Sequence, residues 1–394
     1  MSNNAGFFDR RQAAAVLKHG ILKRYPVVFA SKTGRWQDRG RTAIIDAYAG
    51  PGQYDDGADG SPLLLTDVAL FAEQLGRQVT LVFAESNEEF ATNLKVALHE
   101  RGAADAPVLV GDFESRMHDA LSICRGMPLL TFLDPFGTSI SYDSLTTKLM
   151  GRARTKSEVL LHFSLSSVAR KGAIARTPET VSADAFTRQL DTFLGGTWWH
   201  EMMPSSDERF DGDATRAAIA ISDEYARRVC ARCACRSIAV DVYASTDPCV
   251  LPKYRLMLFT RSDHGLWAFA DAAGRAHLEW LQFCEDREVD RLVEADRRKY
   301  QSDGLFPRDR PDPKELQRLL DKQVGPVLDQ QLSDLLERGP VQFGRDTIQV
   351  YGRALGHANE RHVGHSARRL VEAGVAKKPD RYSNLVGVTL EPAD

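Results

Sequence analysis

The chain has 394 residues, of which 43% are hydrophobic and 27% charged, and its formal net charge is −3. These values are ordinary for a globular protein with room for two or three domains. The small negative charge excludes a global basic field, so a nucleic-acid site would have to be a local basic patch. No apolar run approaches the roughly 18 residues of a membrane span, and the charged N-terminus does not resemble a signal peptide. We therefore expect a cytoplasmic protein.

The first predicted element is an amphipathic helix over residues 8–30, which we expect Pro26 to end. Strand-like apolar runs then alternate with helical patterns as far as EVLLHFS at 158–164. Nearly continuous apolar strands between helices indicate a parallel sheet covered on both faces. The predicted fold class is thus α/β with a Rossmann-like sheet, whose ligands would bind at the carboxyl ends of the strands.

Residues 166–232 interrupt this alternation, because they are mostly helical, and strands resume at 236–243 and 253–261. We interpret 166–232 as a helical insertion between the fifth and sixth strands. Its Trp198 and Trp199 could stack on a base, but packing onto the sheet is the favoured interpretation. Cys230, Cys233 and Cys235 lie where a helix is predicted to run into a strand. Packing of small thiols is favoured over a metal knuckle, because no second Cys or His pair has matching spacing.

A polar, proline-rich segment at 301–315 predicts a linker between a large domain, 1–300, and a small one, 316–394. The small domain shows a helix at 328–339, a short strand at 341–343, helices at 345–356 and 358–374, and a strand–turn–strand pattern at 375–391. This order resembles a winged helix, which meets phosphates with its third helix and its wing. The candidate nucleic-acid-binding residues are Arg361, Arg368, Arg369, Lys377 and Lys378. A protein-docking domain with a solvated charged face is the alternative.

Four consecutive strands are predicted to end at a carboxylate: Asp46, Glu85, Asp112 and Asp134. A carboxylate after the second strand can accept both ribose hydroxyls of a nucleoside, which suits Glu85. Asp112 could accept the adenine amino group, with Phe113 against the ring. Taken singly, each acid could also be a helix cap. The four together favour a nucleoside-bearing cofactor.

The segment AGPG at 49–52 follows the first of these acids, and Gly50 and Gly52 would let the backbone approach a ligand closely. It lacks the G-x-G-x-x-G pattern, and no basic phosphate clamp is present. A cofactor without phosphates fits better, namely S-adenosylmethionine (SAM), with its ammonium group near Asp46 and Gly50. The predicted cofactor residues in the sheet are Asp46, Ala49, Gly50, Gly52, Glu85, Ser86, Asp112 and Phe113.

The fourth strand ends in FLDPFG, which resembles the Asp-Pro-Pro-Tyr motif of methyltransferases that modify exocyclic amino groups. In that motif the acid and the next carbonyl accept the hydrogens of the amine, and the aromatic residue stacks on the base. The candidate catalytic residues are therefore Asp134, Pro135 and Phe136. Phe136 comes one position early, and Gly137 holds the usual aromatic position. A structural Asp-Pro turn is the alternative.

Together, VLKHGILKRY, IIDAYAGPGQYDDG, GSPLLL, FAES and FLDPFG are similar to the three-Cys-motif partner proteins, TcmP, with likeness from about residue 14 to the C-terminus. The resemblance implies a class I methyltransferase-like fold and association with a separate three-cysteine protein. VLKH and the acidic Asp-Pro motif also resemble, more distantly, the ribosomal-RNA adenine methyltransferase RlmJ. That likeness implies that Lys18 and His19 lie at the cofactor site.

The leading hypothesis is a SAM-dependent methyltransferase that acts on an exocyclic amine of a nucleobase in nucleic acid, without a covalent enzyme intermediate. The alternative is a non-catalytic or regulatory SAM-binding subunit. Such a subunit would use the C-terminal domain to dock a three-cysteine partner protein or nucleic acid.

Overall fold

The computed structural model describes residues 13–34, 40–54, 56–135, 137–152, 156–177, 182–203, 211–300 and 309–393. The chain forms two compact units. The sheet unit contains Leu22–Val242 and Leu251–Gly265, and the helical unit contains 13–21, Tyr243–Val250 and 266–393. Within these described ranges, no helix combines the length and the apolar composition needed to cross a membrane.

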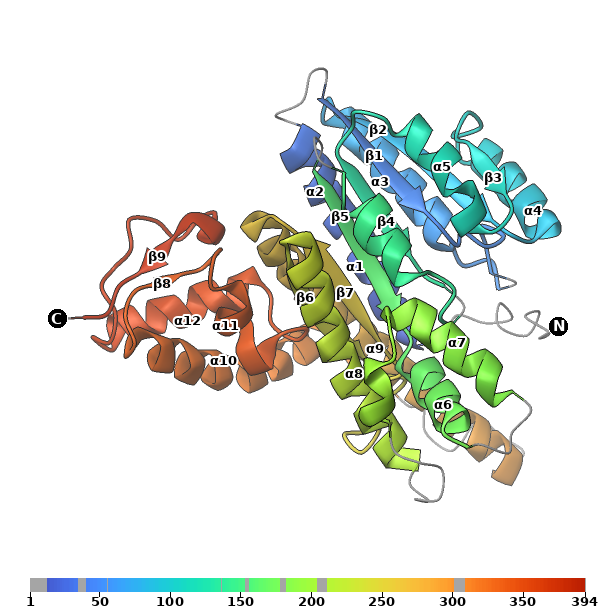
Figure 1. The fold of residues 1–394 in the computed structure, drawn as a ribbon. Helices are drawn as coiled ribbons and strands as arrows, with labels where there is room; N and C mark the ends of the chain where they lie inside the picture. The colour runs from blue at the N-terminus through green and yellow to red at the C-terminus, as the bar shows by residue number, and fades with distance from the viewer. Residues whose placement is uncertain are drawn as a thin grey trace. The chain divides into compact units, whose positions relative to one another are not determined.

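The sheet unit is built on a seven-stranded sheet in the order β3-β2-β1-β4-β5-β7-β6 (Figure 1). The first five strands are parallel, and β7 is antiparallel to both β5 and β6. The strands are β1 Arg41–Asp46, β2 Gln78–Glu85, β3 Val108–Val110, β4 Leu129–Leu133, β5 Ser157–Phe163, β6 Arg236–Val242 and β7 Tyr254–Thr260. The predicted Rossmann-like α/β sheet is confirmed, because the apolar runs are central strands buried on both faces.

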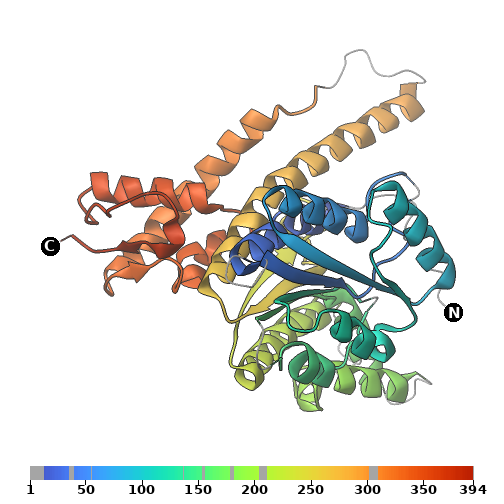
Figure 2. The ribbon, with the colours of Figure 1, turned by 90° about the horizontal axis from the view of Figure 1, so that it is seen from above.

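Helices cover both faces of this sheet (Figure 2). The helices of the sheet unit are α2 Tyr25–Gly34, α3 Ser61–Gln74, α4 Glu88–Glu100, α5 Phe113–Ile123, η3 Ser144–Leu149, α6 Leu165–Ala175, α7 Ala183–Leu194, η4 Trp198–Glu201 and α8 Asp211–Cys233. One face packs against α5 and α6–α8 in a single apolar core. The α2 helix packs on the other face, where the Tyr25 hydroxyl donates to Glu158 of β5.

The helix expected over residues 8–30 is instead two helices, α1 Ala13–Leu22 and α2, and residues 8–12 lie outside the described residues. Pro26 does not end a helix but sits in the first turn of α2. The prediction was wrong because a missing N–H group costs nothing in a first turn, where no carbonyl precedes it to be paired.

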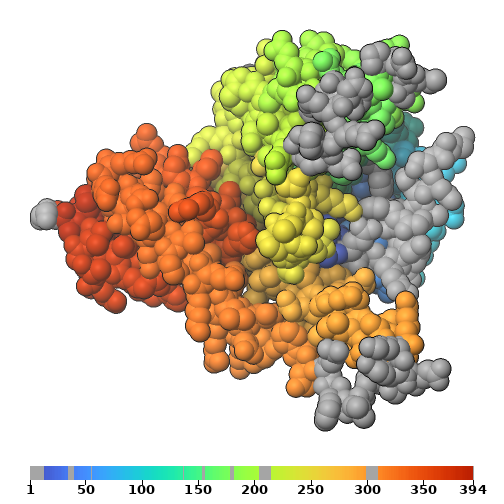
Figure 3. Space-filling model, turned by 90° about the horizontal axis from the view of Figure 1, so that it is seen from below, coloured from blue at the N-terminus to red at the C-terminus, as the bar shows by residue number. Residues whose placement is uncertain are grey.

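Between β5 and β6 the chain forms the helices α6–α8, as the sequence predicted, and the surface of this part of the chain is green to yellow-green in Figure 3. Trp199 is fully buried and donates to Asp191, 2.9 Å away, so its packing role is also confirmed. At the junction of α8 and β6, Cys235 Sγ lies 4.0 Å from Cys230 Sγ. No group of three or more His, Cys, Asp or Glu side chains in the described ranges is arranged to hold a metal ion.

The helical unit contains α1 up to Ile21 and α9 from Leu266 onward, together with the C-terminal elements. The elements beyond α1 are α9 Asp263–Tyr300, α10 Pro313–Leu336, β8 Val341–Gln342, α11 Thr347–Tyr351, η5 Gly352–Ala354, α12 Glu360–Glu372, η6 Leu385–Gly387 and β9 Thr389–Leu390. β8 pairs with β9 in antiparallel fashion, and Ala376 bridges to Pro392. The predicted division at 301–315 stays a prediction, and residues 301–308 lie outside the described residues.

Two close contacts hold α9 in the helical unit. A Cβ on Gly20 of α1 would lie 2.6 Å from Ala276 Cβ, so only glycine allows α1 to approach α9 this closely. Trp267 of α9 stacks on Phe343 with ring centroids 5.8 Å apart. The buried residues of α9, which lie between Leu266 and Trp280, therefore share a core with the C-terminal elements.

Candidate active site

The carboxylates that end the first four strands lie along one edge of the sheet. Asp46 and Glu85 are the last residues of β1 and β2, Asp112 follows β3, and Asp134 follows β4. Since β3, β2, β1 and β4 are parallel neighbours in that order, their carboxyl ends meet at one edge. The register agrees, because Asp46 pairs with Phe83 of β2 and Phe132 of β4.

Glu85 joins the ends of β1 and β2. One of its carboxylate oxygens accepts the Gly50 N–H at 2.8 Å, and the other accepts the Asn87 N–H at 2.7 Å. The side chain is buried. The Ser86 hydroxyl also donates to the second oxygen, at 3.4 Å. A carboxylate offers about four lone-pair sites, so these three donors leave acceptor capacity for at least one hydroxyl of a ligand.

The two glycines of AGPG need to be glycine for different reasons. Gly50 and Gly52 have φ of +69° and +93°, in the region that favours glycine. A Cβ on Gly52 would lie 3.2 Å from Leu94 Cδ1 and Ala97 Cβ of α4. Close approach at Gly52 is thus to a helix of the chain itself, and not only to a ligand as the sequence suggested. Ala49 beside them is buried and donates its N–H to the Ala84 carbonyl at 3.0 Å.

Asp112 and Phe113 have clear structural roles. The Asp112 carboxylate caps α5 by accepting the Ser115 N–H at 3.2 Å. Phe113 is buried in the core, 6.2 Å from the ring of Tyr48 between centroids. Both roles leave their predicted contacts with adenine as predictions, and the cap shows why a strand-end acid is ambiguous in sequence. Ser86, by contrast, is exposed after β2.

Lys18 and His19 are both buried on α1, in the part assigned to the helical unit. Their predicted contact with the cofactor stays a prediction. The other cofactor and catalytic candidates belong to the sheet unit.

Asp134 pairs with a residue that the sequence analysis missed, His162 of β5. The imidazole Nδ1 of His162 is in hydrogen-bond contact with Asp134 Oδ1. Leu133 pairs with Leu161 in the sheet, so Asp134 and His162 are the next residues side by side. His162 was overlooked because its meaning depends on which strand lies beside β4. The usable signal was an isolated histidine near the end of the apolar run EVLLHFS.

Four polar side chains share one face of the sheet at this edge. Direct partners across strands, and residues two apart along a strand, point to the same side. Asp46 pairs with Phe132, two residues before Asp134, and His162 pairs with Leu256, two residues after Tyr254. Asp46, Asp134, His162 and Tyr254 therefore form a row across the adjacent strands β1, β4, β5 and β7. We name this set the edge row.

The turn after β4 explains the departure from the aromatic motif. Gly137 has φ of +93°, and a Cβ there would lie 3.2 Å from Lys171 Nζ. Lys171 is buried and donates to Thr138 Oγ1 at 2.9 Å, and burial lowers its pKa. An aromatic side chain at position 137 would be strained and would meet the lysine. Pro135 is buried, and Phe136 lies outside the described residues.

Tyr48 links the first and fourth strand ends. Its N–H donates to Asp46 Oδ1 at 3.3 Å, and its hydroxyl accepts from Ser139 Oγ at 3.2 Å. Burial raises the pKa of Tyr48 above its usual range, and the charges of Asp112 and Glu114 act in the same direction. Tyr48 therefore stays a neutral phenol at this edge.

Of the five basic residues predicted to meet nucleic acid, two form ion pairs within the helical unit. Arg361 forms an ion pair with Asp321 at 3.1 Å, and Arg369 forms a two-pronged one with Asp329 at 2.7 and 2.8 Å. These pairs fasten α12 to α10. The Arg368 guanidinium lies over the Tyr382 ring at 4.9 Å. The sequence showed the charges but not their partners, which lie about 40 residues away in the chain.

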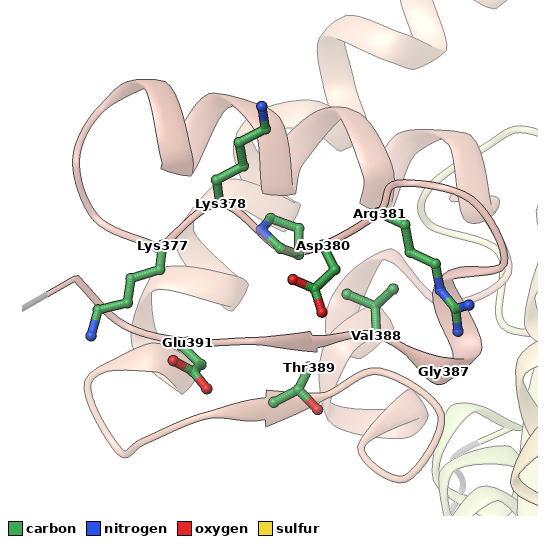
Figure 4. Close-up of a pocket in the computed structure, with 9 residues that line it drawn as sticks. Lys377, Lys378, Asp380, Arg381, Gly387, Val388, Thr389 and Glu391 are labelled. Atoms are coloured by element: carbon green, nitrogen blue, oxygen red, sulfur yellow. The ribbon is translucent and has the colours of Figure 1, made fainter.

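Lys377 and Lys378 line a hollow of about 410 Å³ in the C-terminal segment, together with Asp380, Arg381 and Glu391 (Figure 4). In Figure 4 both lysine side chains extend away from the centre, whereas Asp380 points toward Thr389. The hollow is therefore of mixed charge, and the lysines lie on its rim.

No protein-family model matches the chain, and no curated protein matches its sequence. Solved structures that match include an O-methyltransferase from Bacillus cereus in complex with SAH, with 11% identity, a TM-score of 0.32 and coverage of 62% of this chain and 80% of that chain. The O-methyltransferase TomG from Streptomyces achromogenes in complex with SAM has 12% identity, a TM-score of 0.30 and coverage of 59% and 78%. The small RNA methyltransferase HEN1 has 14% identity, a TM-score of 0.31 and coverage of 60% and 25%. At these scores, the function has to be inferred from the chain's own residues.

Proposed function

We propose that this protein is a SAM-dependent methyltransferase that acts on a nucleobase in nucleic acid. The observation that carries the proposal is the series of carboxylates at one edge of a parallel sheet, with Glu85 beside the positive-φ Gly50. In this proposal Glu85 accepts the ribose hydroxyls, and Asp46 holds the cofactor's ammonium group. The two O-methyltransferases reported above were solved with SAH and with SAM.

Transfer itself would be an in-line displacement, in which an acceptor atom attacks the methyl carbon and sulfur leaves. Such a reaction depends mostly on holding two reactants in line. The edge row beside the AGPG turn offers that alignment, because Asp46 and Asp134 lie at the ends of adjacent strands. Asp134 and the Pro135 carbonyl are the groups proposed to position an exocyclic amine.

We propose that the C-terminal segment follows the winged-helix order and delivers the nucleic acid. The pairing of β8 with β9 and the bridge from Ala376 to Pro392 support this order. Because Arg361 and Arg369 are engaged by α10, the phosphate contacts are assigned mainly to Arg368, Lys377 and Lys378.

The second candidate is a non-catalytic SAM-binding subunit, which Gly137 favours because it cannot carry the aromatic residue of the amine-methylating motif. The TcmP resemblance would then supply a three-cysteine protein as its partner. The two candidates differ in whether methyl groups leave the cofactor.

Calorimetry with SAM and with its demethylated product tests cofactor binding. Glu85→Ala should weaken binding about 10- to 100-fold, since hydrogen bonds to charged groups contribute roughly 1.5–3 kcal/mol. Glu73→Gln, a change to an exposed carboxylate near the end of α3, is the matched control and should leave binding unchanged. No binding by the wild type, or equal binding by Glu85→Ala, would refute the cofactor assignment.

Methyl-labelled SAM, incubated with heat-denatured DNA and with total RNA, tests the reaction. Label in nucleic acid supports the methyltransferase, and binding of SAM without any transfer supports the subunit. Replacing Arg368, Lys377 and Lys378 with Ala should weaken binding and flatten its salt dependence, by about 0.7–0.9 per lost phosphate contact on a log–log plot. The control Arg291→Ala with Arg298→Ala, on α9, should leave the slope unchanged. Equal slopes in all three proteins would favour protein docking.

A further inference from the structure

We infer that His162, oriented by Asp134, accepts a proton from the methyl acceptor during transfer. The inference rests on the proposed function and deepens it, because it names the acceptor class. Asp134 would then act through His162 as a positioning residue, rather than as the direct partner of the amine. The two side chains are held together by adjacent parallel strands, so their pairing is set by the sheet itself.

The orientation of the imidazole ring fixes its chemistry. A carboxylate accepts hydrogen bonds, so Asp134 selects the form of His162 that carries its proton on Nδ1. Nε2 is then a bare acceptor. It is buried and has no hydrogen-bond partner among the residues that the structure describes. Leaving a buried polar atom unpaired costs about 1–3 kcal/mol, and such atoms call for an explanation, of which a catalytic role is one.

The surroundings of His162 suit the charge that it would acquire. The Tyr254 ring packs against the imidazole with centroids 3.9 Å apart. A ring face attracts a cation, and the Asp134 carboxylate balances its charge. Both neighbours therefore stabilise the imidazolium that forms when Nε2 takes a proton. Asp46 lies on the same face two strands away, so the proposed base and the proposed cofactor edge are on one side of the sheet.

The step balances as follows. A nitrogen or oxygen of the acceptor attacks the methyl carbon of SAM, and the new bond forms as the carbon–sulfur bond breaks. The bonding electrons go to sulfur, which becomes a neutral thioether, and the acceptor's N–H or O–H proton passes to Nε2 and later to water. The acceptor class is therefore a group with a proton to lose, such as an exocyclic amine, a ring N–H or a hydroxyl. Acceptors without such a proton gain nothing from His162.

A second His–Asp pair in the chain provides a matched control. His200 Nε2 lies 3.0 Å from Asp191 Oδ1, with about 30% of the His200 side chain exposed. This pair joins η4 to α7 and lies outside the edge row. It is also a histidine–aspartate pair, but it does not present an unpaired ring nitrogen at the strand ends.

The first experiment needs no acceptor. Nitrogen NMR of the full chain, labelled with ¹⁵N-histidine and assigned with His162→Gln, reports which ring nitrogen carries a proton. We expect Nδ1–H and a bare Nε2 at pH 7–8, and loss of this preference in Asp134→Asn. In catalytic triads the same kind of change costs about 10⁴-fold in rate, because the wrong tautomer forms. A protonated Nε2 throughout pH 6–9 would overturn the inference.

The second experiment measures transfer of label from SAM to the denatured DNA and RNA used above. His162→Gln should lower the transfer rate about 10²- to 10⁴-fold, and should change the dependence of the rate on pH. SAM affinity should stay within about twofold, because uniform binding is untouched. His200→Gln should match the wild type in both measurements.

The outcomes separate this inference from the proposed function. If His162→Gln transfers methyl groups at the wild-type rate with the wild-type pH profile, the inference fails and the methyltransferase stands. If the wild type binds no SAM, the proposed function fails and the inference with it. Should His162→Gln unfold, Asp134→Asn carries the kinetic test, since it must also lower the rate and leave SAM affinity unchanged.

Discussion

The two ends of β5 present buried titratable side chains on the same face of the sheet, and they differ in how these are satisfied. At the start of the strand, Glu158 accepts hydrogen bonds from the hydroxyls of Tyr25 and Thr260. At its end, His162 bonds to Asp134 through Nδ1 and leaves Nε2 without a partner in the described part of the chain. Glu158 and His162 are four residues apart on one strand, so their side chains point to the same face of the sheet.

This difference separates a structural polar group from a functional one better than burial does. Glu158 is tied to α2 and β7 by two hydroxyl donors of the chain itself, and it lies at the opposite end of the strand from the edge where ligands of parallel sheets bind. His162 has one ring nitrogen, Nε2, without a hydrogen-bond partner among the described residues, and it lies at the edge where ligands of parallel sheets bind. A residue with unused hydrogen-bonding capacity is therefore the better candidate, even when its neighbour in the strand is more deeply buried.

The largest expected effect is the loss of Glu158. Glu158→Ala leaves two buried hydroxyls without their acceptor and opens a cavity, so we expect a loss of about 3–5 kcal/mol in unfolding free energy. Chemical denaturation of the wild type and the variant measures it. His162→Gln, at the other end of the strand, should cost less than about 1.5 kcal/mol, because glutamine can still donate to Asp134. Similar losses for the two variants would remove the distinction.

Glu158→Gln sharpens the same comparison through pH. Burial raises the pKa of Glu158, while the hydrogen bonds from Thr260 and Tyr25 oppose the shift. The folded state then binds the proton more tightly than the unfolded state, so stability is fully present below about pH 4.5 and falls as the pH rises through the folded value. The variant, which has no carboxylate, should lack this fall. A wild-type curve that rises over that window relative to Glu158→Gln would contradict the sign.

A buried histidine in the helical unit extends the comparison to a ring without a carboxylate partner. His277 of α9 contacts His357 Nδ1 at 2.9 Å, and burial, followed by the charge of His357, lowers its pKa to about 3. Between pH 6.5 and 3, His277 binds a proton in the unfolded chain but not in the folded chain. Stability should therefore fall with decreasing pH, by at most about 1.4 kcal/mol per pH unit. Unfolding followed at several pH values should show this acid loss in the wild type and not in His277→Gln.

The smallest expected effect concerns the turn beside Asp134. Gly137→Ala should cost about 1–2 kcal/mol, because alanine is strained at positive φ and its Cβ would press on Lys171. Gly57, with φ of +79° and nothing within 4 Å of an added Cβ, is the matched control. The excess cost of Gly137→Ala over Gly57→Ala, measured by thermal unfolding, isolates the lysine contact. Equal losses of stability in the two variants would show that Lys171 moves aside and that the turn tolerates a side chain at position 137.

Sequence reasoning succeeded where one periodic signal decides the structure. The apolar runs predicted the strands, and the acids after them lie together at one edge of the sheet, as expected. It failed to find His162, because a partner on a neighbouring strand follows from strand order and register, which no local pattern records. It also overlooked that Arg369 is held by Asp329, since ion pairs between distant segments follow from packing.

Other predictions stay open because the residues have two valid explanations. Asp112 was assigned to a ligand, and it also caps a helix. Gly52 was assigned to close approach by a cofactor, and it also makes room for α4. In both cases the local residue type was interpreted correctly, and only the identity of the neighbour was missing.

The contacts that order the AGPG turn and the residues after it, as far as Asp59, affect how quickly a ligand can bind. Glu85 holds Gly50 from one side, and Arg101 at the end of α4 bridges Asp59 and Asp67 on the other, at 2.8 and 2.9 Å. A turn that is already ordered loses little freedom when a ligand arrives, so association needs no folding step. The two fastenings respond differently to added electrolyte, because Arg101 is partly exposed and screened whereas Glu85 is buried. High ionic strength should thus loosen the outer part of the turn first, around Asp59, and leave the inner part at Gly50 in place.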